Sequence, residues 1–93
     1  MFKLEQTVRP HPEVVDTEIS AEEVALLHLE SKVYFSLNLT GARIWQSLKE
    51  GLSLKEVCQR LQDEFDVDAE RAERSVLGLV EELLGQNLVQ IVD

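Results

Sequence analysis

The chain has 93 residues, with 18 acidic and nine basic side chains and a formal net charge of −9. This length suits one small domain, and the acidic surplus argues against nucleic acid or anionic membranes as partners, because both attract basic surfaces. The sequence has no apolar run of the about 18 residues that a membrane span needs, no apolar secretory segment within residues 1–12, and one cysteine, which cannot form an internal disulfide. These features predict a single cytosolic domain over residues 1–93.

The first part of the chain predicts strands after a loose segment over residues 1–12. Alternating or continuous apolar residues, many of them β-branched or aromatic, indicate three strands. Short polar turns at residues 20–22 and 30–32 join neighbouring strands, which favours an antiparallel meander. The predicted strands cover residues 13–19, 24–29 and 33–37.

The pattern becomes helical after Asn38. Thr40 is a predicted N-cap, and the helix that it opens covers residues 41–50, with Ile44, Trp45 and Leu48 at helical spacing. Gly51 follows as a C-terminal stop, because glycine adopts the left-handed conformation that ends a helix. This segment therefore predicts a short helix that directly follows the third strand.

Two further helices follow the first. Ser53 with Glu56 three residues later has the pattern of a capping box, and the helix that it opens ends near Phe65. Asp68 caps a third and longer helix, whose apolar residues recur at the spacing of a helix packed on a core. These apolar residues are Ala72, Val76, Leu79, Val80 and Leu83.

The third helix ends at Gly85 or Asn87, since both residue types adopt the left-handed conformation readily. Residues 88–92 form an apolar tail, which suits a short strand or a strap over the core. Three strands followed by three helices predict an α+β fold, winged-helix-like, with a three-stranded antiparallel sheet covered on one face by helices.

The sequence contains no catalytic or metal-binding pattern. His11 lies in the loose segment, and a packed or surface histidine is the ordinary interpretation of His28 in its strand. Cys58 lies beside the apolar stripe of the second helix, where a free cysteine behaves as a small hydrophobe. These three residues lack zinc spacing, and the acidic run over residues 63–70 lacks the glycine and the closing glutamate of a calcium loop. We therefore expect no enzyme activity, no cofactor and no metal.

The third strand has the pattern of a binding surface. Val33, Phe35 and Leu37 share one of its faces, while Tyr34 places an aromatic ring on the other. If this strand lies at the edge of the sheet, its unpaired backbone groups can accept another strand. An ordinary half-buried tyrosine is the alternative interpretation. The candidate binding residues are Lys32, Val33, Tyr34, Phe35, Ser36 and Leu37.

The third helix has a similar ambiguity. Leu77 lies beside its apolar stripe, next to charged residues, so this flank can be one wall of a groove or the margin of a wide core stripe. Gly78 in mid-helix costs about 1 kcal/mol relative to alanine. Close approach of a peptide explains this glycine, and close helix–sheet packing explains it equally well.

The junction between the third strand and the first helix carries a resemblance to a known family. Residues 37–45 read LNLTGARIW, and this junction resembles that of PqqD-like proteins. Residues 51–57 (GLSLKEV), 65–68 (FDVD) and 83–89 (LLGQNLV) resemble further segments of the family in the same order. The resemblance covers about residues 14–89, and its GARIW segment is more similar to the lasso peptide branch.

The resemblance implies a fold and a function. PqqD-like proteins have a winged-helix-like fold and bind the leader segment of a ribosomally made precursor peptide without catalysis. The leader adds as a strand to the edge of the third strand and lies against the third helix, and the domain presents the precursor to a leader peptidase or modifying enzyme. On the third helix the implied peptide-binding residues are Arg71, Arg74, Leu77, Gly78 and Glu81. A turn, a cap and core anchors are the roles expected of Asn38, Thr40, Gly41, Ile44 and Trp45.

Two other functions stay open. A winged-helix DNA-binding regulator needs a basic recognition helix, whereas the second helix mixes Lys55 and Arg60 with acidic residues. A protein-interaction module of a biosynthetic complex would use the same strand edge for a protein partner. A precursor peptide encoded beside the gene favours leader recognition over this second alternative.

Overall fold

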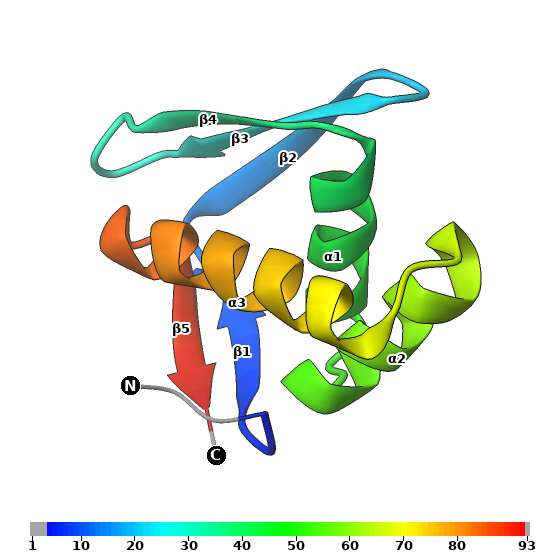
Figure 1. The fold of residues 1–93 in the computed structure, drawn as a ribbon. Coiled ribbons are helices and arrows are strands. Elements are labelled where there is room, and N and C mark those ends of the chain that lie inside the picture. The colour runs from blue at the N-terminus through cyan, green and yellow to red at the C-terminus, as the bar shows by residue number, and fades with distance from the viewer. Residues whose placement is uncertain (1–3, 93) are drawn as a thin grey trace.

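The structure, a computed structural model, describes residues 4–92. An antiparallel pair joins β1 to β5, and a separate antiparallel sheet has the order β2-β3-β4. Figure 1 shows this three-stranded sheet lying above α3, with the β1–β5 pair below that helix. No helix among residues 4–92 is long and apolar enough to cross a membrane. The elements are β1 (Thr7–Pro10), β2 (Val14–Ser20), β3 (Glu23–His28), β4 (Tyr34–Leu37), α1 (Leu39–Lys49), α2 (Leu54–Phe65), α3 (Ala69–Gly85) and β5 (Val89–Val92).

The predicted meander and the α+β class are confirmed, while the winged-helix likeness stays a prediction. The three expected strands are β2, β3 and β4, each within one residue of its predicted bounds. The third strand begins at Tyr34, because Lys32 in the preceding turn has a φ of 65°, which lies outside the extended region. β2 and β4 are the outer strands of this sheet, so the third predicted strand is an edge strand.

The expectation of a loose segment over residues 1–12 is wrong for residues 7–10. Those residues form β1, which pairs with β5 in a register that places Thr7 opposite Val92. Val8 is fully buried, so the burial of its side chain and the ladder to β5 together order the segment. Residues 1–3 of the predicted loose segment lie outside the described residues. The apolar tail predicted as a strand or strap forms β5.

Side-chain caps set the helix bounds. The sequence predicts Thr40 as the first N-cap, but Asn38 holds this position, and its Oδ1 accepts a hydrogen bond from the backbone N–H of Gly41 at 2.9 Å. Asparagine caps as well as threonine does, so the helix begins two residues earlier than expected. The capping box of Ser53 and Glu56 and the cap at Asp68 are confirmed.

Trp45 attaches α1 to the three-stranded sheet. Its side chain is 3% exposed, and its indole Nε1 donates a hydrogen bond to Oδ2 of Asp16 in β2 at 2.7 Å. Lys49 Nζ lies 2.9 Å from the same oxygen. Partial burial raises the pKa of Asp16, but the hydrogen bonds from Trp45 and Lys49 and the lysine charge outweigh this effect and leave the pKa below its usual value. The ionised carboxylate thus fixes α1 beneath β2.

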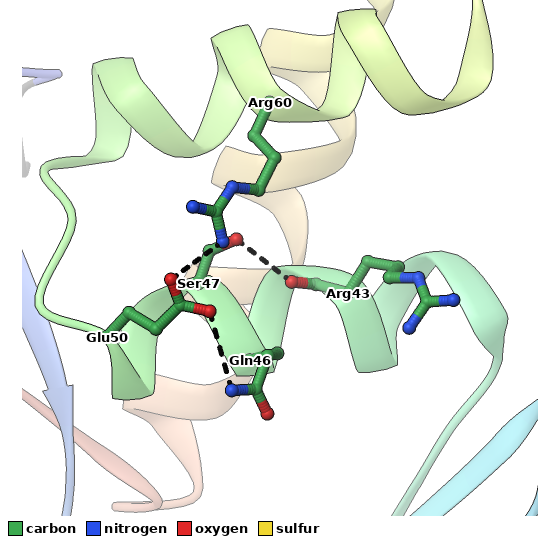
Figure 2. A network of polar contacts seen from close by, with 5 residues as sticks. All are labelled: Arg43, Gln46, Ser47, Glu50 and Arg60. Atoms are coloured by element: carbon green, nitrogen blue, oxygen red, sulfur yellow. Dashed lines mark hydrogen bonds and ion pairs between the residues drawn. The ribbon is translucent and has the colours of Figure 1, made fainter.

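Polar contacts connect α1 to α2 (Figure 2). The Glu50 carboxylate accepts hydrogen bonds from Arg60 Nη1 at 3.0 Å and from Gln46 Nε2 at 3.4 Å. These two donors hold the pKa of Glu50 below its usual value. Arg43 in α1 also pairs with Glu64 in α2. The pairs are exposed and individually weak, yet they connect both ends of α1 to the neighbouring helix.

Candidate functional site

The outer edge of β4 has backbone groups that no strand of the described chain uses. His28 N–H donates to the Val33 carbonyl at 2.9 Å, which makes these two residues a hydrogen-bonded pair of the β3–β4 ladder. Hydrogen-bonded and non-hydrogen-bonded pairs alternate along an antiparallel ladder. Tyr34, opposite Leu27, and Ser36, opposite Ala25, are therefore non-hydrogen-bonded positions. Their N–H and C=O groups point away from β3, toward the open edge.

A hollow of about 510 Å³ lies beside this edge. Residues of β4, of the first turn of α1 and of α3 line it, together with residues around the β2–β3 turn. Its volume is in the range that holds several side chains of a bound ligand. The lining residues are Ser20, Glu22, Glu23, Phe35, Ser36, Leu37, Asn38, Gly41, Leu79 and Glu82.

Two smaller hollows extend the first one along α3. The second hollow has a volume of about 350 Å³, and the third has a volume of about 340 Å³. The first and second hollows share Leu79 and Glu82, and the second and third share Thr40 and Ser75. The three together are named the β4–α3 groove, which leads from the open strand edge toward the start of α3. The two smaller hollows add Thr40, Ile44, Leu61, Phe65, Val67, Arg71 and Ser75.

One face of α3 forms a wall of this groove. Arg71, Ser75, Leu79 and Glu82 follow one another at steps of four, four and three residues, which keeps them on one side of a helix. The buried residues of α3 form a neighbouring stripe that packs into the core. These buried residues are Ala72, Val76, Val80 and Leu83.

Gly41 allows the groove to reach the junction of β4 and α1. A Cβ built on Gly41 would lie 3.3 Å from the Leu37 side chain and 3.3 Å from Oδ1 of Asn38. Both contacts are tighter than ordinary van der Waals packing, so a larger residue would displace the cap of α1. The predicted structural roles of Asn38 and Gly41 therefore have a direct geometric cause.

A family comparison identifies the chain. The model of the family described as coenzyme PQQ synthesis protein D (PqqD) matches residues 23–89, which is more than half of the 93 residues. The chain belongs to the PqqD family. The resemblance that the strand-to-helix junction predicts is confirmed. A comparison with curated proteins finds no match.

Two solved structures are similar to this PqqD family member. One is described as TbiB1 in complex with the TbiA(beta) leader peptide. It is 33% identical, with a TM-score of 0.81 over 87% of this chain and 93% of that chain. The other is described as lasso peptide synthetase B1 complexed with the leader peptide. It is 32% identical, with a TM-score of 0.75 over 92% of this chain and 98% of that chain. The likeness to the lasso peptide branch is thereby confirmed.

The strand residues implied by the PqqD resemblance lie along the open edge. Val33 and Phe35 are half-buried and Leu37 is buried, so the face that these three residues share is the inward face of the strand. Tyr34 is 64% exposed, so the alternative of a half-buried tyrosine does not hold. Lys32 and Ser36 are exposed, and Ser36 Oγ donates to Oε2 of Glu23 at 2.7 Å.

The helix residues implied by the same resemblance are more scattered. Arg71 lines the third hollow. Arg74, Gly78 and Glu81 are exposed but line none of the three hollows, and Arg74 pairs with Glu70 at 2.9 Å. Leu77 is half-buried and packs against the core cluster, which agrees with the wide core stripe. Of the predicted site residues, the groove thus brings together Phe35, Ser36, Leu37 and Arg71, while Lys32, Val33 and Tyr34 line none of the three hollows.

Ser75, Leu79 and Glu82 line the groove on α3, and the sequence reasoning missed them as site residues. The spacing of Leu79 fits the apolar stripe and predicts a core residue, whereas Leu79 is half-buried at the boundary between core and groove. The spacing of these residues, three or four positions apart, is the only sequence signal for this wall. The signal can be used only when the element that faces this side of α3 is known. Position in the fold, rather than residue type, defines these three lining residues.

Neither histidine nor the cysteine lines the groove. His28 is fully buried, and its Nδ1 accepts backbone N–H bonds from Glu30 at 3.2 Å and Ser31 at 3.3 Å. It therefore shapes the turn that leads into β4. Burial raises the pKa of the Cys58 thiol, and the charge of Glu73 adds to this, so the thiol is protonated at neutral pH. Within residues 4–92, no three His, Cys, Asp or Glu side chains cluster as metal ligands do.

Gly78→Ala is expected to raise the free energy of unfolding by about 0.5–1 kcal/mol, because alanine loses less backbone entropy in a helix. A Cβ on Gly78 would meet no neighbouring atom within 4 Å, so close helix–sheet packing does not explain the glycine. Urea denaturation followed by circular dichroism measures the change. Gly51→Ala is the matched control and should destabilise the fold, because Gly51 has a φ of 84°. A loss of stability in Gly78→Ala would contradict this account.

Proposed function

We propose that this PqqD family member binds the leader segment of a ribosomally made precursor peptide, and that it performs no reaction itself. The leader adds as an antiparallel or parallel strand to β4, and part of it occupies the β4–α3 groove. The domain then presents the precursor to a leader peptidase or modifying enzyme, in a pathway of the lasso peptide type. The two similar solved structures, both complexes with leader peptides, support this proposal.

The observation that carries the proposal is the set of outward N–H and C=O groups of Tyr34 and Ser36 beside the groove. Strand addition satisfies these groups with main-chain hydrogen bonds, which hold any extended peptide. Selectivity then comes from alternate side chains, because every second residue of an added strand points to the same side. On one side lie the half-buried Phe35 and the groove, and on the other lies the exposed ring of Tyr34.

The test is a titration of the purified protein with a fluorescent leader peptide encoded beside its gene. We expect saturable binding with a dissociation constant below about 1 μM. A scrambled peptide of the same composition is the control, since it keeps the charge and length but loses the order of side chains. Equal binding of both peptides, or none by the folded protein, would contradict leader recognition. Binding of the pathway's enzyme alone would instead favour a protein-interaction module.

A further inference from the structure

Three carboxylates line the largest hollow of the groove. Glu22 and Glu23 come from the turn and strand at the β2–β3 junction, and Glu82 comes from α3. Glu23 accepts the hydrogen bond from Ser36 Oγ at 2.7 Å. Among the described residues, no lysine or arginine lines this hollow or pairs with any of the three. The hollow therefore holds negative charge that the protein itself does not balance.

The described basic residues that form ion pairs do so elsewhere. Arg43, Lys49, Arg60 and Arg74 pair with Glu64, Asp16, Glu50 and Glu70, on other surfaces. The net charge of −9 adds to the negative potential around the hollow. Glu22 and Glu82 are exposed, so the attraction of these carboxylates for a cation is moderate and falls as the salt concentration rises.

The same hollow has apolar walls. Phe35 and Leu79 line it together with the carboxylates, and both are half-buried. It adjoins the open edge of β4 at Ser36, so side chains of a strand added to that edge can enter it. Successive residues on one side of a strand are two positions apart. The hollow is thus suited to one apolar and one basic side chain from the same side of an added strand.

We propose that the groove selects leader peptides that carry a lysine or arginine two positions from an apolar residue. The apolar side chain packs against Phe35 and Leu79, and the basic group pairs with Glu82 and the carboxylates of the β2–β3 junction. This inference rests on the proposed leader binding and adds a sequence requirement to it. The open strand edge and the hollow define the site, and the carboxylates define which peptide it prefers.

The test combines leader variants with a variant of the groove. Each lysine or arginine of the leader is replaced by glutamine in turn, and the affinities for wild-type protein and for Glu82→Gln are measured. We expect one leader position at which the replacement weakens binding to wild type about tenfold, as for loss of a charge-assisted hydrogen bond. The same replacement should have little effect on binding to Glu82→Gln. Raising the salt concentration should weaken binding more in wild type than in Glu82→Gln.

Glu18→Gln is the matched control. Glu18 lies on β2, on the opposite side of the sheet from β4, is exposed and lines none of the three hollows, so this variant makes the same charge change outside the groove. It should bind the leader as wild type does. If the leader binds wild type but all basic replacements are neutral, or if Glu18→Gln and Glu82→Gln weaken binding equally, the charge requirement is overturned while leader recognition stands. If wild type binds no leader, both proposals are overturned.

Discussion

Replacing Trp45 by alanine is expected to lower the free energy of unfolding by about 3–5 kcal/mol, as for a large buried aromatic side chain. The change removes the indole from the core and leaves the Asp16 carboxylate without its N–H donor at 2.7 Å. Natural domains are stable by about 5–15 kcal/mol, so the variant should lose a large fraction of its stability. Trp45 is the only tryptophan, so urea denaturation should be followed by far-ultraviolet circular dichroism rather than by fluorescence.

Trp45→Phe separates the two contributions of this side chain. Phenylalanine retains much of the apolar contact with the core but cannot donate to Asp16. We expect a smaller loss than for alanine, and the Asp16→Asn variant should then cost less stability in the Trp45→Phe background than in wild type, because only the contact with Lys49 is left to lose. A loss below about 1 kcal/mol in Trp45→Ala would show that the indole contributes little to the core and would contradict its role as an anchor.

Ser36→Pro is expected to abolish leader binding while the fold survives. Ser36 is a non-hydrogen-bonded position of the β3–β4 ladder, so its N–H points outward and proline removes a donor at the docking edge without breaking the ladder. The ring also occupies the space that an added strand needs. The loss of one main-chain hydrogen bond alone amounts to about tenfold in affinity, and the steric clash adds to it.

Ser36→Ala is the control for this experiment, because it removes the hydroxyl that bonds Glu23 but keeps the backbone N–H. Binding should therefore fall far more in Ser36→Pro than in Ser36→Ala. Circular dichroism and the unfolding midpoint establish that the proline variant is folded. A folded Ser36→Pro variant that binds the leader as tightly as wild type would place the docking site elsewhere on the molecule.

Local patterns in the sequence predict most of the local structure. The capping box at Ser53, the cap at Asp68 and the alternation along residues 33–37 each depend on neighbours within a few positions, and all three are present in the structure. The pairing of β1 with β5 is different, because it joins Thr7 to Val92 across nearly the whole chain. A four-residue strand such as β1 has too little periodicity to be recognised without its partner.

In the candidate site, too, the features set by near neighbours were predictable and those set by distant parts of the chain were not. The strand residues were predictable because alternation along a single strand separates its two faces, and the family resemblance indicated which strand docks the peptide. The α3 wall was less predictable, because Leu79 satisfies the spacing of the core stripe while its side chain lies at the margin of the groove. Only the packing of α3 against α2 and β5 decides which of its flanks stays accessible.

The β1–β5 pair has a practical consequence for handling the protein. Because Thr7 lies opposite Val92, the two ends of the described chain meet on the side of α3 away from β4 in Figure 1. A tether or a fusion partner joined through either end would therefore leave the strand edge and the groove facing outward. Immobilising the protein on a sensor surface through one end, and then through the other, should give the same association and dissociation rates for a leader peptide.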